Sequence, residues 1–515
     1  MKTRSGFFYI LASIILVVPL VFQLFASAQT VNADTTSDAF NVTLHKRVFD
    51  EGKVPADKQN TGDVMSDFGG TGLNGVTFTV YDVTDHYLDL RDGGNTAEQA
   101  TTAVQKDAVD AAPAYANKVK DQQTTTTNQE DGVATFSNLR MKDSKGNYMT
   151  YLFVETDSPS NITQKAAPIV LTLPIFKSGS NTEINNDVQI YPKDEQTEAI
   201  TKDLNDDSKK SLEVTLHNGD KVLHNGDKVY NAEYGQTFGY NITVAVPWNI
   251  KDKATFEVVD TPNKGIKADV NSVAVTGLTK DTDYTVTANG DGFKVTFDKS
   301  KAAVQAAAGK KLVVNYDVTL TNDAVPDVAI WNKAELTIGN GSDVTTTPAE
   351  GPKIYTGGAK FITQDKDSHK TLANAEFQLV KVDNSGKVVS YANQGADGKY
   401  TWSGTDTNAT TYTSNETGLV EVKGLPYSSK LEEGQSYALI ETKAPEGYAK
   451  LTAPVKFVVT QGSYADAQKV EIDNITKGLL PSTGGNGIYI YIAAGLVVVV
   501  LAAIGYSIAK RREEV

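Results

Sequence analysis

Apolar and polar residues alternate along most of the chain between residue 41 and residue 477. An apolar side chain at every second position fits a strand with one buried face. Glycine and Asn-Gly turn signals separate these segments, which favours short antiparallel strands. In the first third of the chain, the predicted strands are Asn41–Val48, Leu73–Asp82, Gly132–Phe136, Tyr148–Thr156 and Asp187–Asp194.

The same alternation continues in two further blocks. The middle block contains Ile200–Leu204, Tyr240–Pro247, Thr255–Asp260, Phe293–Phe297, Leu312–Leu320 and Ile330–Ile338, and the last block contains Lys360–Asp365, Leu372–Val380 and Tyr437–Thr442. The last block echoes the first, because Tyr437-Ala-Leu-Ile-Glu-Thr442 resembles Tyr151-Leu-Phe-Val-Glu-Thr156. Strands at this spacing predict an all-β protein of tandem Ig-like β-sandwiches.

Two stretches depart from the strand pattern. Thr96–Lys120 is polar and rich in alanine, which predicts a helix-bearing loop insertion. Leu216–Val222 repeats without change at Leu223–Val229. Its Asn-Gly pair is a hairpin-turn signal, so we interpret it as a duplication at a loop tip and assign it no function.

Both ends of the chain have the composition of processing signals. Lys2 and Arg4 precede the apolar stretch Phe7–Val21, which predicts a secretory signal peptide cleaved after Ala28 or Ala33. At the other end, an uncharged apolar run from Ile488 to Ile508 is about the length that spans a hydrocarbon core of roughly 30 Å. The pentapeptide before it is Leu480-Pro481-Ser482-Thr483-Gly484, and the basic cluster after it is Lys510-Arg511-Arg512. These three features together are typical of a processing signal at the end of a chain, and a simple single-span membrane anchor is the alternative interpretation.

These boundaries predict three domains between the two signals. We expect a signal peptide at 1–33 and a terminal segment at 479–515 that contains the pentapeptide, the apolar run and the basic tail. Pro348, Gly351 and Pro352 mark a short linker before the third domain. The expected domains are residues 34–195, 196–355 and 356–478.

Composition narrows the function. The chain has no cysteine, so an exported protein of this sequence must be stabilised by its cores or by another kind of staple. A net charge of −14 argues against nucleic-acid binding. We find no phosphate-binding glycine loop and no Gly-x-Ser-x-Gly motif, and we expect no cofactor and no enzyme of the usual kind. The histidines show no metal-ligand spacing; they are His45, His86, His217, His224 and His369.

Several charged or amide side chains fall on the apolar faces of predicted strands. In the middle block, Lys202 shares a face with Ile200, Asp260 with Val258, and Asn332 with Ile330. Such groups are costly if they are buried without partners, so each must find one. A hydrogen-bonded polar trio without a covalent bond would satisfy them. In the other two blocks, the residues on apolar faces are Lys46, Glu155 and Asp194, and Glu441 and Asn474.

Three motifs, taken together, resemble a known family. Leu480–Gly484 with its tail looks like the LPxTG sorting signal of Gram-positive surface proteins. Tyr437–Tyr448 (YALIETKAPEGY) matches the E-box of Gram-positive pilins, and Ile190-Tyr-Pro-Lys193 looks like the pilin motif. The chain therefore resembles the backbone pilins of sortase-assembled pili, which are built from Cna-B-like domains.

The resemblance implies a polymerisation chemistry. A sortase would cut between Thr483 and Gly484, hold the Thr483 carbonyl as a thioester and transfer it to Lys193 of the next subunit. Strand alternation places Tyr191 and Lys193 on the outward face, as an acceptor amine requires. An ordinary surface lysine is the alternative interpretation of Lys193.

The family also forms Lys–Asn isopeptide bonds inside its domains, on neighbouring strands. The resemblance implies a Lys202–Asn332 bond with Asp260 as proton relay. It also implies a bond involving Lys46 with Glu155 as relay, although Asp194 stands where relatives commonly carry asparagine. A Lys46–Asp194 bond would release water, and a buried ion pair is the alternative.

The third domain departs from the family pattern. Thr363 stands where relatives usually carry the reactive lysine, and Lys360 is the nearest substitute. Either Lys360 bonds to Asn474 with Glu441 as relay, or this domain has no bond.

The implied partners are a pilin-specific sortase, a housekeeping sortase, identical subunits in a linear polymer, minor pilins and peptidoglycan. The implied location is the cell wall and outer surface of a Gram-positive bacterium. The sequence does not identify a host ligand. A wall-anchored adhesin that never polymerises, or a minor pilin, remains as a rival; an adhesin would not need Lys193.

Overall fold

The computed structural model describes residues 39–159, 161–215, 223–224, 227–340, 343–478 and 495–501. The expected signal peptide, most of the duplicated segment, the pentapeptide Leu480–Gly484 and most of the apolar run lie outside these residues. Within the described ranges, no helix has the length and apolar character needed to cross a membrane. The chain divides into two compact units, one reaching to Gly357 with 395–400 and 423–430, and one formed by the remaining later residues.

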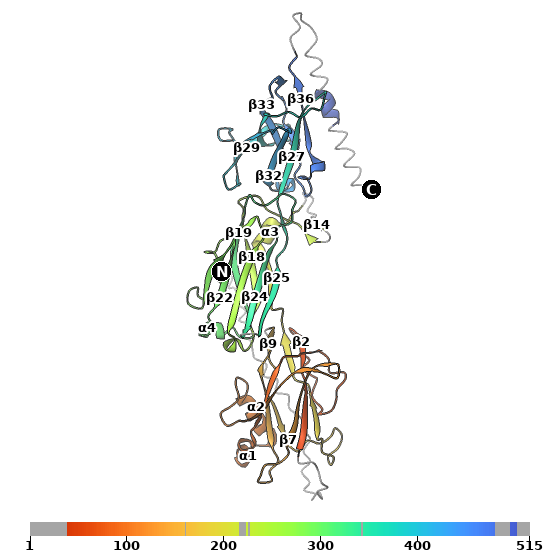
Figure 1. Cartoon of the computed structure of the whole chain (residues 1–515), viewed down its shortest axis with the longest axis vertical. Coiled ribbons are helices and arrows are strands. Elements are labelled where there is room, and N and C mark those ends of the chain that lie inside the picture. The colour runs from red at the N-terminus through yellow and green to blue at the C-terminus, as the bar shows by residue number, and fades with distance from the viewer. Residues whose placement is uncertain are drawn as a thin grey trace, which may run out of the picture. The chain divides into compact units, whose positions relative to one another are not determined.

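The N-terminal part of the first unit, residues 39–196, contains three four-stranded sheets (Figure 1). Their orders are β11-β1-β7-β6, β10-β8-β4-β5 and β3-β2-β12-β9. The strands are β1 Ala39–His45, β2 Arg47–Asp50, β3 Thr71–Gly72, β4 Thr77–Asp82, β5 Asn117–Gln123, β6 Thr125–Thr127, β7 Glu130–Arg140, β8 Thr150–Asp157, β9 Ile162–Gln164, β10 Ile169–Thr172, β11 Asp187–Ile190 and β12 Lys193–Gln196. A core of alternating apolar residues, including Val42, Leu44, Phe78, Phe153 and Ile190, lies between the sheets.

The helix expected between residues 96 and 120 is present as α2, Ala97–Asp107. Thr96 caps it, because its hydroxyl accepts from the Gln99 amide while the Gln99 side chain accepts from the Thr96 amide. Two features in and next to this insertion were not predicted. A second helix, α1, spans Thr84–Asp92, and the end of the insertion forms β5 against β4.

The middle part of the first unit consists of two facing sheets, β13-β17-β23-β19 with β20, and β21-β22-β18-β24-β25. In Figure 1, β18, β22, β24 and β25 lie side by side. One large apolar core joins the two sheets. The elements are β13 Ile200–Leu204, α3 Asp206–Leu212, β14 Leu223–His224, β15 Asp227–Lys228, β16 Tyr230–Asn231, β17 Thr237–Ala245, η1 Ile250–Asp252, β18 Thr255–Pro262, β19 Ile266–Ala268, β20 Ala274–Val275, β21 Tyr284–Asn289, β22 Gly292–Phe297, α4 Ala302–Gln305, β23 Lys311–Leu320, β24 Asn332–Asn340, β25 Asp343–Glu350 and β26 Ile354–Tyr355.

The second unit contains the sheets β32-β27-β36-β34 and β30-β29-β28-β33-β35, with β31 paired to β28. The all-β prediction is thus confirmed, and so is the burial predicted from strand parity at Asp260, Asn332 and Asn474. The elements from residue 357 onward are β27 Gly357–Asp365, β28 Glu376–Val382, β29 Val388–Gln394, β30 Tyr400–Ser403, β31 Thr411–Thr413, β32 Leu419–Leu425, η2 Ser428–Lys430, β33 Ser436–Lys443, β34 Tyr448–Ala449, β35 Val455–Phe457, η3 Asp466–Gln468 and β36 Val470–Thr476. Of these, η2 and the end of β32 belong to the first unit.

Candidate functional sites

The first candidate site contains Lys46, Glu155 and Asp194, which the structure brings into direct contact. The Lys46 Nζ donates to Glu155 Oε2 at 2.6 Å and to Asp194 Oδ1. All three side chains are fully buried. The Lys46 amine also lies 5.4 Å from the centre of the Phe78 ring. An amine and two carboxyl groups are therefore confined in a dry pocket, as the sequence predicted.

The protonation of this cluster follows from its burial. Burial raises the pKa of Asp194 well above its usual range, and the nearby charge of Glu155 raises it further, while Lys46 lowers it. Among the described residues, no hydrogen-bond donor reaches Asp194 Oδ2 or Glu155 Oε1. A proton on Asp194, shared with Glu155, would satisfy both oxygens. The cluster can thus hold a neutral carboxylic acid beside an amine.

Strand pairing sets this geometry. Lys46 stands between β1 and β2, and β2 runs parallel to β12, with Val48 opposite Asp194. Asp194 therefore lies two positions further along its strand than the residue opposite Lys46. The long Lys46 side chain can span that distance. Glu155 comes from the facing sheet, where it pairs with Phe78.

The second candidate site contains Lys202, Asp260 and Asn332. The Lys202 Nζ donates to Asp260 Oδ1 and to the Lys333 carbonyl, the latter at 3.0 Å. The aromatic rings of Tyr240 and Tyr316 lie 5.3 and 5.5 Å from the amine. The side chains of Lys202 and Asp260 are fully buried, and Asn332 is 0% exposed.

Sequence reasoning missed a fourth member of this site, Tyr316. Its hydroxyl donates to Asp260 Oδ1 at 2.7 Å and accepts from Asn332 Nδ2 at 3.1 Å. Tyr316 shares the buried face of β23 with Val314 and Val318. Strand parity could have placed it inside, but a tyrosine among apolar residues gives no sign of a polar role.

Burial changes the pKa values of Lys202 and Asp260 in the directions that favour their neutral forms. It lowers the pKa of Lys202 to about 8, against the opposing attraction of Asp260. It also raises the pKa of Asp260, although hydrogen bonds from Lys202, Tyr316 and Asn332 oppose the shift. Within the described residues, no donor reaches Asp260 Oδ2 or Asn332 Oδ1. The ion pair can therefore exchange a proton to give a neutral amine and a carboxylic acid.

The middle site differs from the expectation of neighbouring strands. Lys202 lies on β13, which pairs with β17 in one sheet. Asp260 and Asn332 lie on the adjacent strands β18 and β24 of the facing sheet. A Lys202–Asn332 bond would join the two sheets, whereas a Lys46–Asp194 bond would join parallel strands of one sheet.

The third candidate site lacks a lysine. Asn474 Nδ2 donates to Glu441 Oε1 at 2.8 Å, and the Leu451 amide donates to Glu441 Oε2 at 2.6 Å. Thr363 is 0% exposed, and within the described residues its hydroxyl has no hydrogen-bond partner. The acid and the amide are thus in place without a nucleophile of lysine length.

Strand register places Thr363 where the N-terminal site has Lys46. β27 runs parallel to β36, with Asp365 opposite Asn474, so Asn474 lies two positions beyond the level of Thr363. Glu441 pairs with Phe377 as Glu155 pairs with Phe78. The two sites share one framework, and the lysine of the first is replaced by threonine in the other.

The structure places Lys360, the substitute lysine, away from Asn474. Its position is five residues from that of Asp365, which is about 16 Å along a strand. The Lys360 amine instead binds Asp466 Oδ1 at 2.6 Å and lies 4.4 Å from the centre of the Tyr464 ring. Sharing a face with Ile362 puts Lys360 on the outer side of the strand, because Phe361 and Thr363 are the buried residues.

The candidate acceptor Lys193 is half-buried, more covered than the strand pattern predicted. Its amine donates to the carbonyls of Pro55 at 2.7 Å and Lys58 at 3.0 Å. Both belong to the segment 51–70 between β2 and β3. Burial lowers the pKa of Lys193. The loop therefore holds the Lys193 amine through two backbone carbonyls.

The same loop explains a second departure. Tyr191, expected to face outward, is buried because its ring stacks on Phe68 and His45 at 4.7 and 4.6 Å between centres. Its hydroxyl accepts from the Met65 amide at 2.9 Å. Tyr191 therefore lies on the predicted face, but the segment 51–70, which is distant in sequence, covers that face.

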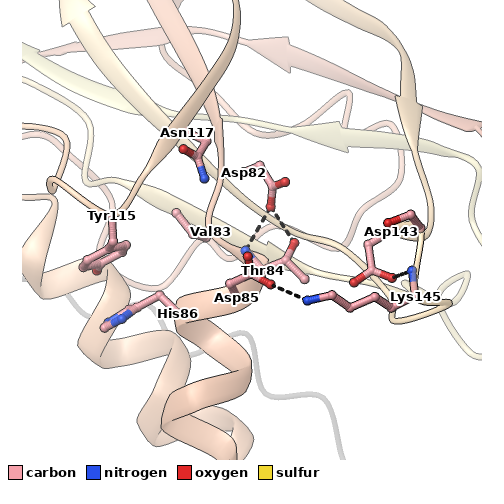
Figure 2. Close-up of a pocket in the computed structure, with 10 residues that line it drawn as sticks. Asp82, Val83, Thr84, Asp85, His86, Tyr115, Asn117, Asp143 and Lys145 are labelled. Atoms are coloured by element: carbon pink, nitrogen blue, oxygen red, sulfur yellow. Dashed lines mark hydrogen bonds and ion pairs between the residues drawn. The ribbon is translucent and has the colours of Figure 1, made fainter.

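A shallow hollow beside α1 holds no candidate residue (Figure 2). Its polar groups bind one another: Asp82 accepts from the amide and hydroxyl of Thr84, and the Asp143 carboxylate accepts from the Lys145 amide. No cluster of metal-ligating side chains is found in the described part of the chain.

Three family matches cover both ends of the described chain. Residues 37–195 match the Gram-positive pilin subunit D1 N-terminal domain, and residues 357–475 match the prealbumin-like fold domain. Residues 472–515 match the LPXTG cell wall anchor motif. The first match ends just after Lys193 and Asp194, and the second includes Glu441 and Asn474.

Whole-length relatives agree with these matches. The chain is 25% identical over 540 residues to "Fimbrial subunit type 2" of Actinomyces naeslundii, covering 95% of this chain and 93% of the relative. It is 26% identical to "Fimbrial subunit type 1" of Actinomyces viscosus over 74% of this chain and 76% of the relative. The solved RrgB pilus protein from Streptococcus pneumoniae has a similar fold, with a TM-score of 0.50, 17% identity and coverage of 87% of this chain and 99% of its own.

Proposed function

The chain belongs to the Gram-positive pilins that carry an LPXTG cell-wall anchor, and we propose that it is the repeating shaft subunit of a sortase-assembled pilus. One observation carries the proposal. A single chain holds both halves of a polymer linkage, an acceptor amine at Lys193 in the pilin domain and a donor carbonyl at Thr483 in the anchor motif. A subunit with both can be extended at either end.

The linkage exchanges one amide for another. The pilin-specific sortase breaks the Thr483–Gly484 peptide bond and holds the Thr483 carbonyl as a thioester. The neutral amine of Lys193 then attacks this carbonyl, the thioester breaks, and Thr483 becomes joined to Lys193 of the next subunit. The lowered pKa of Lys193 favours the neutral amine, which is the reactive form. The housekeeping sortase transfers the finished polymer to peptidoglycan, and minor pilins join by the same chemistry.

The buried clusters supply internal staples in this proposal. Lys202 bonds to Asn332 with Asp260 as proton relay, and ammonia leaves. Lys46 bonds to Asp194 with Glu155 as relay, and water leaves. Both reactions need a neutral amine beside a carboxylic acid in a dry site, which the contacts at both clusters favour. The Glu441–Asn474 pair stays unlinked, because Thr363 offers no amine.

Covalent staples suit a cysteine-free subunit of a fibre under load. A fibre fails when one domain unfolds, so its working stability is a rate of unfolding. We propose three such domains, 34–195, 196–355 and 356–478, between the signal peptide and the anchor.

The test is immunoblotting of cell-wall extracts. The wild-type chain is expected to give a ladder of high-mass bands, and Lys193→Ala is expected to give only wall-anchored monomer. Lys53→Ala is the matched control, because Lys53 is an exposed lysine of the segment that covers Lys193. A ladder that persists in Lys193→Ala would refute the shaft-subunit proposal. A wild-type chain that never forms a ladder would favour a wall-anchored adhesin.

A further inference from the structure

In the middle site a tyrosine hydroxyl contacts both the acid and the amide, unlike in the C-terminal site. In the C-terminal site, Glu441 binds the Asn474 amide nitrogen directly at 2.8 Å. In the middle site, the Asn332 amide nitrogen donates to the Tyr316 hydroxyl, which in turn donates to Asp260. Aspartate is one methylene shorter than glutamate, and in the middle site the tyrosine hydroxyl forms hydrogen bonds with both the acid and the amide.

We propose that the Tyr316 hydroxyl is a catalytic proton relay that carries a proton from Asp260 to the departing amide nitrogen of Asn332. The proposal rests on the Lys202–Asn332 bond proposed above and adds a fourth catalytic group to it. Tyr316 qualifies as catalytic because its oxygen touches the nitrogen that leaves.

The proton balance requires that one proton reach the leaving nitrogen. Lys202 first passes one proton to Asp260, which produces a neutral amine and a carboxylic acid. The amine nitrogen then forms a bond to Asn332 Cγ, and the Cγ–Nδ2 bond must break. An amide nitrogen is a poor leaving group unless it gains a proton, so that it departs as ammonia.

Tyr316 stands where that proton has to pass. As Nδ2 becomes basic in the tetrahedral intermediate, it accepts the phenolic proton, while Tyr316 takes the proton held by Asp260. The second proton released by the Lys202 nitrogen returns to Asp260, which ends the reaction protonated. One ammonia leaves, the net charge is unchanged, and no outside reactant is needed.

The surroundings of Tyr316 support a concerted transfer. The residue is buried, and its pKa is raised well above the usual range by burial and by the neighbouring charge of Asp260. A free phenolate is therefore disfavoured, so Tyr316 gives up its proton only as it receives another. The hydroxyl bridges Asp260 Oδ1 and Asn332 Nδ2, and the other polar atom of each side chain, Asp260 Oδ2 or Asn332 Oδ1, meets no donor within the described residues.

The chain offers a matched control in Tyr240. Its ring also lies above the Lys202 amine, at 5.3 Å compared with 5.5 Å for Tyr316. Its hydroxyl, however, donates to the Pro352 carbonyl at 3.5 Å, away from the amide nitrogen. Tyr240→Phe and Tyr316→Phe each remove one buried hydroxyl beside the same amine, but only Tyr316→Phe breaks the relay.

The experiment follows bond formation during cell-free synthesis of the chain from Asp34 to Thr483. Samples are denatured at intervals, and the branched peptide that joins Lys202 to Asn332 is quantified by mass spectrometry. We expect Tyr240→Phe to link at close to the wild-type rate and Tyr316→Phe to link about 100-fold more slowly or worse, the usual contribution of general acid catalysis. Hydrogen exchange of β17 and β23 checks that each variant folds.

Non-natural residues separate proton transfer from packing. At position 316, 3-fluorotyrosine keeps the hydroxyl and is expected to restore linkage, whereas 4-fluorophenylalanine fills the same space without a proton and is expected not to. Rapid linkage with 4-fluorophenylalanine or in Tyr316→Phe would overturn the relay while leaving the cross-link intact. A wild-type chain without the branched peptide would instead refute the proposed bond, and the relay with it.

Discussion

A lysine at position 363 should create a new cross-link in the C-terminal region. Thr363 occupies the register position that corresponds to Lys46, two residues before the position that pairs with Asn474. Asn474 is already hydrogen-bonded to Glu441. In Thr363→Lys, the new amine should lie beside Phe377, as the Lys46 amine lies beside Phe78. It should then attack Asn474 and release ammonia, with Glu441 as relay.

The size of the effect follows from the loop that the bond would close. Positions 363 and 474 enclose roughly 110 residues, and closing a loop of that length removes about 4 to 5 kcal/mol of unfolded-chain entropy. Three extra methylenes and an amine in a packed site cost about 1 to 3 kcal/mol. The net gain is about 1 to 4 kcal/mol, which corresponds to about 4 to 16 °C in the unfolding midpoint of a region this size.

Two measurements check this prediction on the chain from Asp34 to Thr483. Mass spectrometry should find a branched peptide joining residue 363 to Asn474, lighter by one ammonia than its parts, and calorimetry should show the higher midpoint. Thr363→Met is the packing control, because it adds a side chain of similar length without an amine. Thr363→Lys combined with Glu441→Gln should stay unlinked and become less stable than wild type, because a buried lysine then lacks a charged partner. A folded Thr363→Lys protein of unmodified mass would refute the register argument.

Three further predictions concern the proposed natural bonds. Tandem mass spectrometry should find Lys46 joined to Asp194 with the loss of one water. Glu155→Gln should abolish this branched peptide. Recovery of both linear peptides in full yield from wild type would mean that the pair is only ionic. Asp260→Ala should leave Lys202 and Asn332 unlinked and lower the unfolding midpoint of the middle region. The reason is that closing a loop of roughly 130 residues is worth about 5 kcal/mol. An unchanged branched peptide would contradict the role of Asp260. In the slow variant Tyr316→Phe, linkage should slow as the pH rises above about 8, because the Lys202–Asp260 pair then loses the proton that the reaction must deliver to the leaving nitrogen; a rate that keeps increasing to pH 10 would contradict this assignment.

Strand alternation in the sequence was sufficient to find most of the buried polar groups. Lys202, Asp260 and Asn332 were each placed on an apolar face, and each is buried. The reason is local, because side chains of a strand alternate between its two faces whatever the strand packs against. The same rule placed Lys46, Glu155 and Asp194 inside, and each of them is buried.

Sequence alternation correctly placed Lys360 on the same face as Ile362, but it did not show whether that face is the buried one. The residue shares its side of β27 with Ile362, and in a two-sided pattern either side could have been the core. Only the pairing of β27 with β36 shows that Asn474 lies beyond Thr363 and far along the strand from Lys360.

The tertiary structure alone decided which groups meet. That Lys202 faces Asn332 across two sheets, that Tyr316 bridges acid and amide, and that segment 51–70 covers Lys193 all depend on contacts between residues distant in sequence. Alternation is a property of one strand, whereas register, sheet order and loop cover arise from packing between strands. A pattern along the chain therefore determined what is buried, and the fold determined what each buried group can react with.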